Sequence, residues 1–253
     1  MRTQFAIRAL AAAACLGTVF GQDTTVFELG PVEVSDASEI DASDRIDQLV
    51  LEQLAELGLE PANLCSDAVF LRRAYLAAIG TLPEEDEVRD FLASTDEAKR
   101  AVVVERLLER PEYADYWAMK WGDLLRVKAE FPIKLWPNAV QAYHKWIRTS
   151  IEDNKPYHVF VQELLVGSGS NFREGQVNFY RAMQDRSPRG IAATVALTFL
   201  GERADQWPER KLDAMAGFFS HVAYKSTAEW KEEIVYLDRK STRLNSSHPV
   251  ESR

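Results

Sequence analysis

Cysteine and histidine are scarce in this sequence, and the scarcity argues against several kinds of site. There are two cysteines, Cys15 and Cys65, and four histidines among 253 residues. No Cys-x-x-Cys, His-Glu-x-x-His or other recognised zinc or iron pattern is present. We therefore expect no bound metal and no cofactor, and we interpret His158 and His221 as surface or structural histidines.

Other functional signatures are missing as well. The glycine-rich stretch GSGSNF, residues 167–172, lacks the Lys-Ser/Thr of a phosphate-binding loop, so it is interpreted as a flexible connection. There is no Gly-x-Ser-x-Gly motif of a serine hydrolase. With 30 basic and 39 acidic residues, the net charge is -9, and no basic cluster appears. Nucleic acid and anionic membrane surfaces are therefore not expected partners.

The N-terminal residues 1–21 resemble a secretory signal peptide. Arg2 and Arg8 precede an apolar run that is too short to span a bilayer, and a small-residue site ends at Gly21. This pattern predicts export, with a periplasmic, secreted or cell-envelope location and no transmembrane segment in the mature chain. A buried N-terminal helix and lipidation at Cys15 are the alternatives. After cleavage Cys65 would be the only cysteine, so no internal disulfide is expected.

Both flanks of the mature chain differ from its centre. Residues 22–45 are rich in acidic side chains and are predicted to be an exposed lead-in. Residues 239–253 are polar and aperiodic, and RKSTRLNSSH resembles the translation of a sequencing adaptor. We interpret this tail as non-native, a disordered native tail being the alternative. The fold is therefore expected within residues 46–238.

Between these flanks the apolar residues recur at helical spacing. The first stripe consists of Ile46, Leu49, Val50, Leu54 and Leu57. Gly58 and Gly80 are placed to end helices, and Pro83 to begin one. Only residues 231–238, KEEIVYLD, alternate like a strand. The sequence predicts an all-α, compact domain of short helices joined by tight turns, with a single strand near its C-terminal end.

Aromatic and charged side chains gather between Trp117 and Trp146. Tyr113, Trp117 and Trp121 recur every four residues, which is typical of a buried helix face but would also suit a sugar-stacking surface. No catalytic residue can be assigned. The candidate binding residues are Asp123, Arg126, Trp136, Asn138, His144, Asn171 and Asn178.

Five segments in a fixed order resemble a known family. They are IDQLVLEQLAELGLEP, LRRAYLAAIGTLPEEDEVRDFL, VVERLLERPEYADYWAMKWGDLLRVK, YHKWIRTSIEDNKPYHVFVQELL and VALTFLG. Together they resemble the planctomycete cytochrome-like domain of unknown function, found in large exported proteins, over residues 46–238. The resemblance implies a downstream partner, because family members usually continue into a second conserved domain. The present chain would then be an N-terminal fragment.

The resemblance also implies where a haem would attach, and this chain departs from it there. Many family members have a Cys-x-x-Cys-His segment between a Leu-Gly pair and a tryptophan. Here only residues 202–206 separate Gly201 from Trp207, and they contain no cysteine or histidine. Covalent haem attachment needs both, so no haem is expected. We expect Gly201 to end one helix, Pro208 to open the next, and Trp207 to fill the space between them.

Two functional hypotheses remain, besides a less favoured haem protein. The first is a non-catalytic helical module of an exported protein, which binds a glycan or envelope component or supports a downstream domain. The second is an enzyme or carbohydrate-processing protein that uses the region from Trp117 to Trp146.

Overall fold

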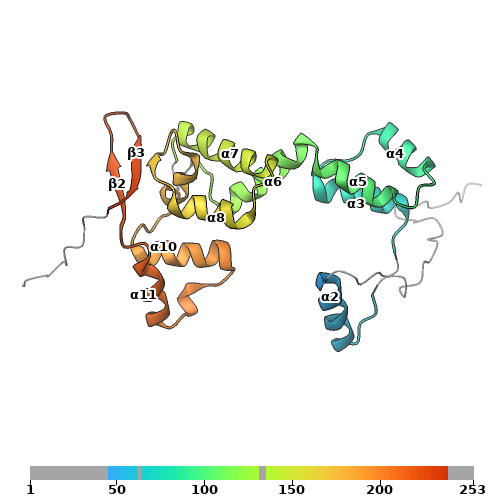
Figure 1. The fold of residues 1–253 in the computed structure, drawn as a ribbon, viewed down its shortest axis with the longest axis horizontal. Coiled ribbons are helices and arrows are strands. Elements are labelled where there is room, and N and C mark those ends of the chain that lie inside the picture. The colour runs from blue at the N-terminus through green and yellow to red at the C-terminus, as the bar shows by residue number, and fades with distance from the viewer. Residues whose placement is uncertain (1–44, 62–63, 131–134, 239–253) are drawn as a thin grey trace, which may run out of the picture. The chain divides into compact units, whose positions relative to one another are not determined.

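The computed structural model describes residues 45–61, 64–130 and 135–238 (Figure 1). The signal peptide, Cys15, the lead-in up to residue 44 and the tail 239–253 lie outside the described residues. The chain divides into two units, residues 1–70 and 71–253, which are described separately.

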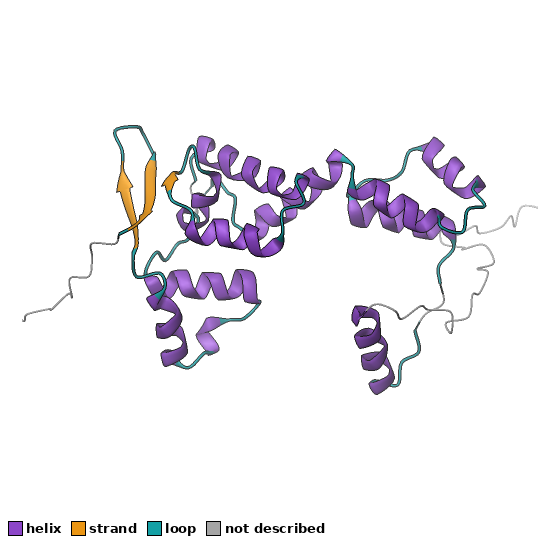
Figure 2. Cartoon of the chain, in the orientation of Figure 1, coloured by secondary structure: helices purple, strands orange, loops and turns teal. Residues whose placement is uncertain are grey.

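Helices form most of the described chain, as the purple ribbons of Figure 2 show. They are α2 (Arg45–Glu56), α3 (Asp67–Ala78), α4 (Glu85–Ala93), α5 (Lys99–Leu108), α6 (Pro111–Leu124), α7 (Pro137–Glu152), α8 (Tyr157–Val166), η2 (Gly175–Val177), α9 (Asn178–Arg181), α10 (Pro188–Val195), η3 (Ala196–Leu200), η4 (Ala204–Gln206) and α11 (Glu209–Gly217). The prediction of a mostly helical fold is confirmed. Among the described residues, no helix has the length and apolar character needed to cross a membrane.

The first unit contains α2 and the first turn of α3. Gly58 adopts a left-handed φ of 68°, and the N–H of Leu59 donates to the carbonyl of Leu54 at 2.9 Å. This arrangement satisfies a carbonyl at the end of the helix, the role for which glycine is favoured. α3 then begins one residue after Ser66, whose carbonyl accepts from the N–H of Phe70 at 2.8 Å.

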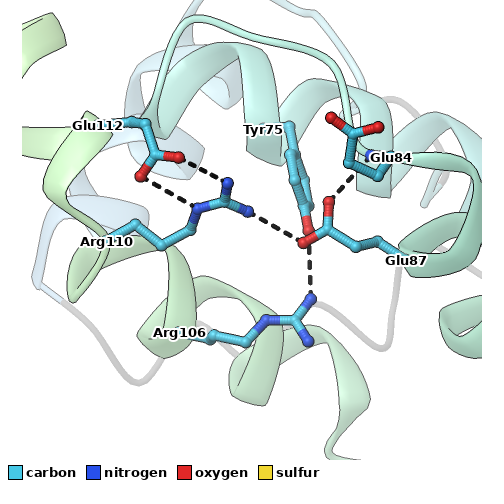
Figure 3. A network of polar contacts seen from close by, with 6 residues as sticks. All are labelled: Tyr75, Glu84, Glu87, Arg106, Arg110 and Glu112. Carbon is cyan, nitrogen blue, oxygen red and sulfur yellow. Dashed lines mark hydrogen bonds and ion pairs between the residues drawn. The ribbon is translucent and has the colours of Figure 1, made fainter.

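In the second unit, α3, α4 and α5 bury a small set of apolar side chains: Leu71, Tyr75, Ile79, Phe91, Val103 and Leu107. A polar network joins these helices to the start of α6 (Figure 3). Arg110 donates to Glu87 at 2.9 Å and to Glu112 at 2.8 Å. Arg106 donates to the hydroxyl of Tyr75 at 3.2 Å. The partners come from four successive helices, so the network fixes how the chain turns between them.

Glu87 is the centre of this network. Burial by itself would raise the pKa of Glu87. That effect is outweighed by hydrogen bonds from the backbone N–H of Glu84 and the hydroxyl of Tyr75, and by the charges of two arginines, so the pKa lies below its ordinary value. The bond that Glu87 accepts from the Glu84 N–H, together with the bond that the Glu84 side chain accepts from the Glu87 N–H, forms a capping box, which is a structural role.

The main core of the second unit is formed by α6 to α11 and the sheet. α7 contributes Ala139, Tyr143 and Ile147 at a spacing of four residues, and all three are fully buried. Leu164 of α8 and Ile191 of α10 pack into the same cluster. The helical period of the sequence thus places one face of α7 in the core and leaves the opposite face for solvent.

Three strands form an antiparallel sheet in the order β1-β3-β2, where a single strand was expected. The expected strand is β3 (Glu233–Leu237), and it pairs with β2 (Val222–Ser226) and with β1 (Gly169–Ser170). β1 lies within GSGSNF. The interpretation of that stretch as a flexible connection was therefore wrong, because Gly169 pairs with Val235 across the sheet. A strand of two residues has no alternation from which it could be predicted.

The connection after η3 follows the expected chain path. Gly201 takes a left-handed φ of 67° as the C-cap of η3, and Pro208 precedes the first residue of α11. The indole N–H of Trp207 donates to Glu202 at 2.7 Å, and Nζ of Lys211 lies 3.7 Å from its ring centroid. Trp207 is half-buried, and these two contacts join it to the connection and to the first turn of α11.

Candidate functional site

A groove of about 740 Å³ runs along the exposed side of α7, and we call it the α7 groove. Its lining comes from α7, from Lys155 in the turn after α7, from residues 172–176, which we call the groove loop, and from Glu229 in the turn between β2 and β3. The residues are Asn138, Gln141, Ala142, Lys145, Trp146, Thr149, Ser150, Lys155, Phe172, Arg173, Glu174, Gly175, Gln176 and Glu229. Its volume falls within the range of about 300–1,000 Å³ that is usual for small-ligand sites.

Most of the side chains that α7 contributes to the groove wall are polar. Asn138, Gln141, Lys145 and Thr149 are three or four residues apart, so they share one helix face. Amide side chains both donate and accept hydrogen bonds. This wall therefore offers mixed hydrogen-bonding groups rather than a single charge.

The opposite wall approaches α7 very closely at Gly175. A Cβ atom at this position would lie 2.4 Å from the carbonyl oxygen of Ala142 and 2.6 Å from Cβ of Trp146. Only glycine allows the loop to pack against the helix here. Gly175 therefore sets the distance between the two walls of the groove.

One aromatic side chain is fixed at the base of the α7 wall. Trp146 stacks on Phe160 with ring centroids 4.8 Å apart, and its indole N–H donates to Glu163 at 3.2 Å. Lys155 donates to the same carboxylate at 2.6 Å, and its Nζ lies 5.0 Å from the Trp146 ring centroid. These contacts hold Trp146 and Lys155 in place before any ligand arrives.

The floor of the groove contains an unpaired hydroxyl. Ser150 is 3% exposed, and within the described part of the chain its Oγ has no hydrogen-bond partner. Ser150 and Lys155 also line a smaller hollow of about 160 Å³ beside Trp117 and Trp121. A buried hydroxyl without a partner is costly. The Oγ atom is itself buried, so the hydroxyl that the α7 wall offers to the groove is that of Thr149, which is exposed.

The charges that line the α7 groove balance. Lys155 is paired with a carboxylate, which leaves Lys145 and Arg173 as cations and Glu174 and Glu229 as anions. Glu174 accepts from the amide of Gln176 at 3.3 Å. A groove of this kind has no excess charge with which to select an anion or a cation.

Three of the candidate residues from the sequence lie at or behind this groove. Asn138 lines it. Asn171 and Asn178 are fully buried and contact each other: the Asn178 side-chain amide donates to the backbone carbonyls of Asn171 at 2.8 Å and Gly175 at 3.1 Å. Asn171 in turn accepts from the backbone N–H of Glu233 at 2.9 Å. Both asparagines therefore position the groove loop rather than face a ligand.

The other four candidates are not among the groove-lining residues. Trp136 is the N-cap of α7 and His144 is an exposed residue of that helix. Asp123 and Arg126 lie where α6 ends, and the backbone N–H of Arg126 donates to the Asp123 carbonyl at 3.2 Å. Arg126 has a φ of 59°. The seven candidates therefore do not form one cluster.

The aromatic stripe of α6 lines the smaller hollow. Tyr113, Trp117 and Trp121 are all half-buried there, and Trp121 also packs against the main core. The indole N–H of Trp117 donates to the carbonyl of Ala78 at 3.1 Å. Sequence reasoning missed most of the α7 groove, although the polar spacing from Asn138 to Thr149 was a usable signal.

Comparison with protein families matches residues 45–224 to PSCyt2, described as a protein of unknown function (DUF1549). The chain belongs to the PSCyt2 family. This confirms the resemblance that the sequence segments indicated. No curated protein and no solved structure matches the chain. The PSCyt2 match covers α7 and the loop before η2, and it ends within β2 at Tyr224.

The cytochrome-like name of the PSCyt2 family raises the question of haem. The chemistry of the side chains between Gly201 and Trp207 does not fit one, because Glu202–Gln206 includes no thiol and no imidazole. Within the described ranges, no group of three or more His, Cys, Asp or Glu side chains is placed to hold a metal ion. We derive no electron transfer from the family name.

Proposed function

We propose that this chain is a non-catalytic ligand-binding module of an exported protein, with the α7 groove as its binding site. The observation that carries the proposal is a groove with fixed walls, one of which presents the exposed side chains of Asn138, Gln141 and Thr149. Rigid walls reduce the entropy that is lost on binding. A few polar side chains on such a wall supply specific hydrogen bonds to a ligand.

The non-catalytic part of the proposal rests on the kinds of side chain in the groove. General acid–base catalysis needs a titratable pair placed against one reacting atom. The groove-lining residues that the structure describes include no histidine and no aspartate, and of the two glutamates Glu174 is bound to an amide. The site supports recognition through amides, hydroxyls and aromatic surface.

Ligand binding at the groove is testable with a matched pair of double variants. We expect a thermal-shift screen of saccharides, peptides and polar metabolites to stabilise the wild-type chain with at least one compound class. Asn138→Ala with Gln141→Ala should abolish that stabilisation. Trp136→Ala with His144→Ala should retain it, because neither residue lines the groove. A chain that no compound stabilises, or chemical turnover of the bound compound, would contradict the proposal.

Export and a partner domain are the second part of the proposal. They are supported by the leader-like residues 1–21 and by the family resemblance. We expect the chain expressed in a Gram-negative host to reach the periplasm with Gln22 as its first residue, which intact-mass measurement would show. Cytoplasmic protein that retains Met1 would contradict export.

Sequencing the source locus beyond the codon for Asp238 tests the proposal of a partner domain. We expect a second domain to follow in frame, and its absence would contradict this part of the proposal.

A further inference from the structure

The turn between β2 and β3 borders the α7 groove and presents an exposed tryptophan. Glu229 in this turn lines the groove. The next residue, Trp230, is 71% exposed. Exposed tryptophan is unusual on a surface that binds nothing, because the side chain carries a large apolar area.

Side-chain hydrogen bonds hold this turn in one shape. The hydroxyl of Thr227 donates to Glu232 at 2.6 Å and accepts from the backbone N–H of Glu229 at 3.1 Å. The hydroxyl of Ser170 also donates to Glu232. The hydroxyls of Ser170 and Thr227 together lower the pKa of Glu232, so its carboxylate stays charged as their acceptor at neutral pH.

Asn171 connects the same turn to the groove loop. Its side-chain amide lies 3.4 Å from the carbonyl of Lys231, and its carbonyl oxygen accepts from the N–H of Glu233 at 2.9 Å. Its backbone carbonyl accepts from Asn178, behind the groove wall. These bonds fix the groove loop to the turn that carries Trp230, so the backbone of Trp230 is held next to the groove residue Glu229 and needs no ordering on binding.

We propose that the α7 groove and Trp230 form one extended site for a neutral saccharide chain, in which Trp230 stacks on a sugar outside the groove. This inference rests on the proposed function and names its ligand class. Sugars present hydroxyl groups, which suit the amides of Asn138 and Gln141 and the hydroxyl of Thr149. They also present C–H faces, which suit an indole ring.

The charges in the site favour a neutral ligand over an anionic one. Among the groove-lining residues, Lys145 and Arg173 are matched in number by the carboxylates of Glu174 and Glu229, and the charge of Arg173 also acts on Glu232. At Trp230, Nζ of Lys231 lies 5.0 Å from the ring centroid, so a cation already occupies part of one ring face. The remaining exposed area of the ring is available to a sugar.

Calorimetric titration of the full chain with saccharides of two lengths tests this inference. The probes are cellohexaose, xylohexaose, mannohexaose and maltohexaose, with the matching disaccharides and polygalacturonate. We expect at least one neutral hexasaccharide to bind. Trp230→Ala should weaken its binding about tenfold and leave the disaccharide affinity unchanged, because only the longer chain reaches the turn. Phe218→Ala is the control, since Phe218 is 80% exposed and does not line the groove.

Each other outcome overturns a distinct part of the account. Equal hexasaccharide affinity in Trp230→Ala and wild type would remove Trp230 from the site, while the groove function would stand if Asn138→Ala with Gln141→Ala still abolishes binding. Binding of polygalacturonate alone would overturn the neutral ligand class. Binding of peptides but of no saccharide in the thermal-shift screen would overturn the saccharide inference and leave the ligand-binding groove in place.

Discussion

Replacing Gly175 by alanine is expected to lower the free energy of unfolding by about 3 kcal/mol, at the upper end for an overpacked site. The added Cβ would lie 2.4 Å from the Ala142 carbonyl oxygen, which is backbone and cannot rotate away. The φ of Gly175 is outside the left-handed region, so the effect is steric. Urea unfolding followed by circular dichroism measures the change.

The same substitution should also weaken ligand binding, because the loop must move away from α7 and widen the groove. Gly217→Ala is the matched control. Nothing lies within 4 Å of a Cβ at Gly217, which is the last residue of α11, so alanine should be neutral there. If Gly175→Ala unfolds at the same urea concentration as Gly217→Ala, the close approach of the loop to α7 is contradicted.

The Glu233→Ala substitution, which removes the carboxylate, is expected to lower the free energy of unfolding by about 3 kcal/mol. Glu233 pairs with Arg181 and, at 3.2 Å, with Arg186. The side chains of Arg181 and Glu233 are only 14% and 17% exposed. Burial already lowers the pKa of Arg181, and without the carboxylate its charge would be left buried and unpaired.

The control for this prediction is an ion pair of similar geometry on the surface. Arg189 and Asp213 are 52% and 54% exposed. Asp213→Ala should leave the unfolding free energy nearly unchanged, because exposed pairs are screened by water. Similar unfolding curves for Glu233→Ala and Asp213→Ala would contradict this prediction, because they would show that the ion pairs of Glu233 with Arg181 and Arg186 do not stabilise the fold.

The helices were predictable because each one carries a local signal. The apolar spacing of residues 46–57 predicts α2, and Gly58, Gly80 and Gly201 adopt a left-handed φ where helices are predicted to end. The sheet was only partly predictable. β3 alternates, but β1 gains its structure from pairing with residues more than sixty positions away, which no local pattern contains.

The groove was harder to predict than the fold. Its walls come from α7, Lys155, residues 172–176 and Glu229, which tertiary packing brings together. Asn138 was selected from the sequence, and so were Asn171 and Asn178, which turn out to be buried supports of the groove loop. The sequence marks Trp146 only as the end of an aromatic stretch. Reading one face of α7 from Asn138 to Thr149 would have identified one wall.

The direct test of the ligand-binding groove is hydrogen–deuterium exchange of the full chain with and without the tightest-binding neutral hexasaccharide. The account predicts slower exchange in peptides that cover residues 138–155 and 171–176 and in the turn around Trp230, with little change in α3 to α5. Protection confined to α3 to α5, or saturating ligand that protects none of these peptides, would contradict it.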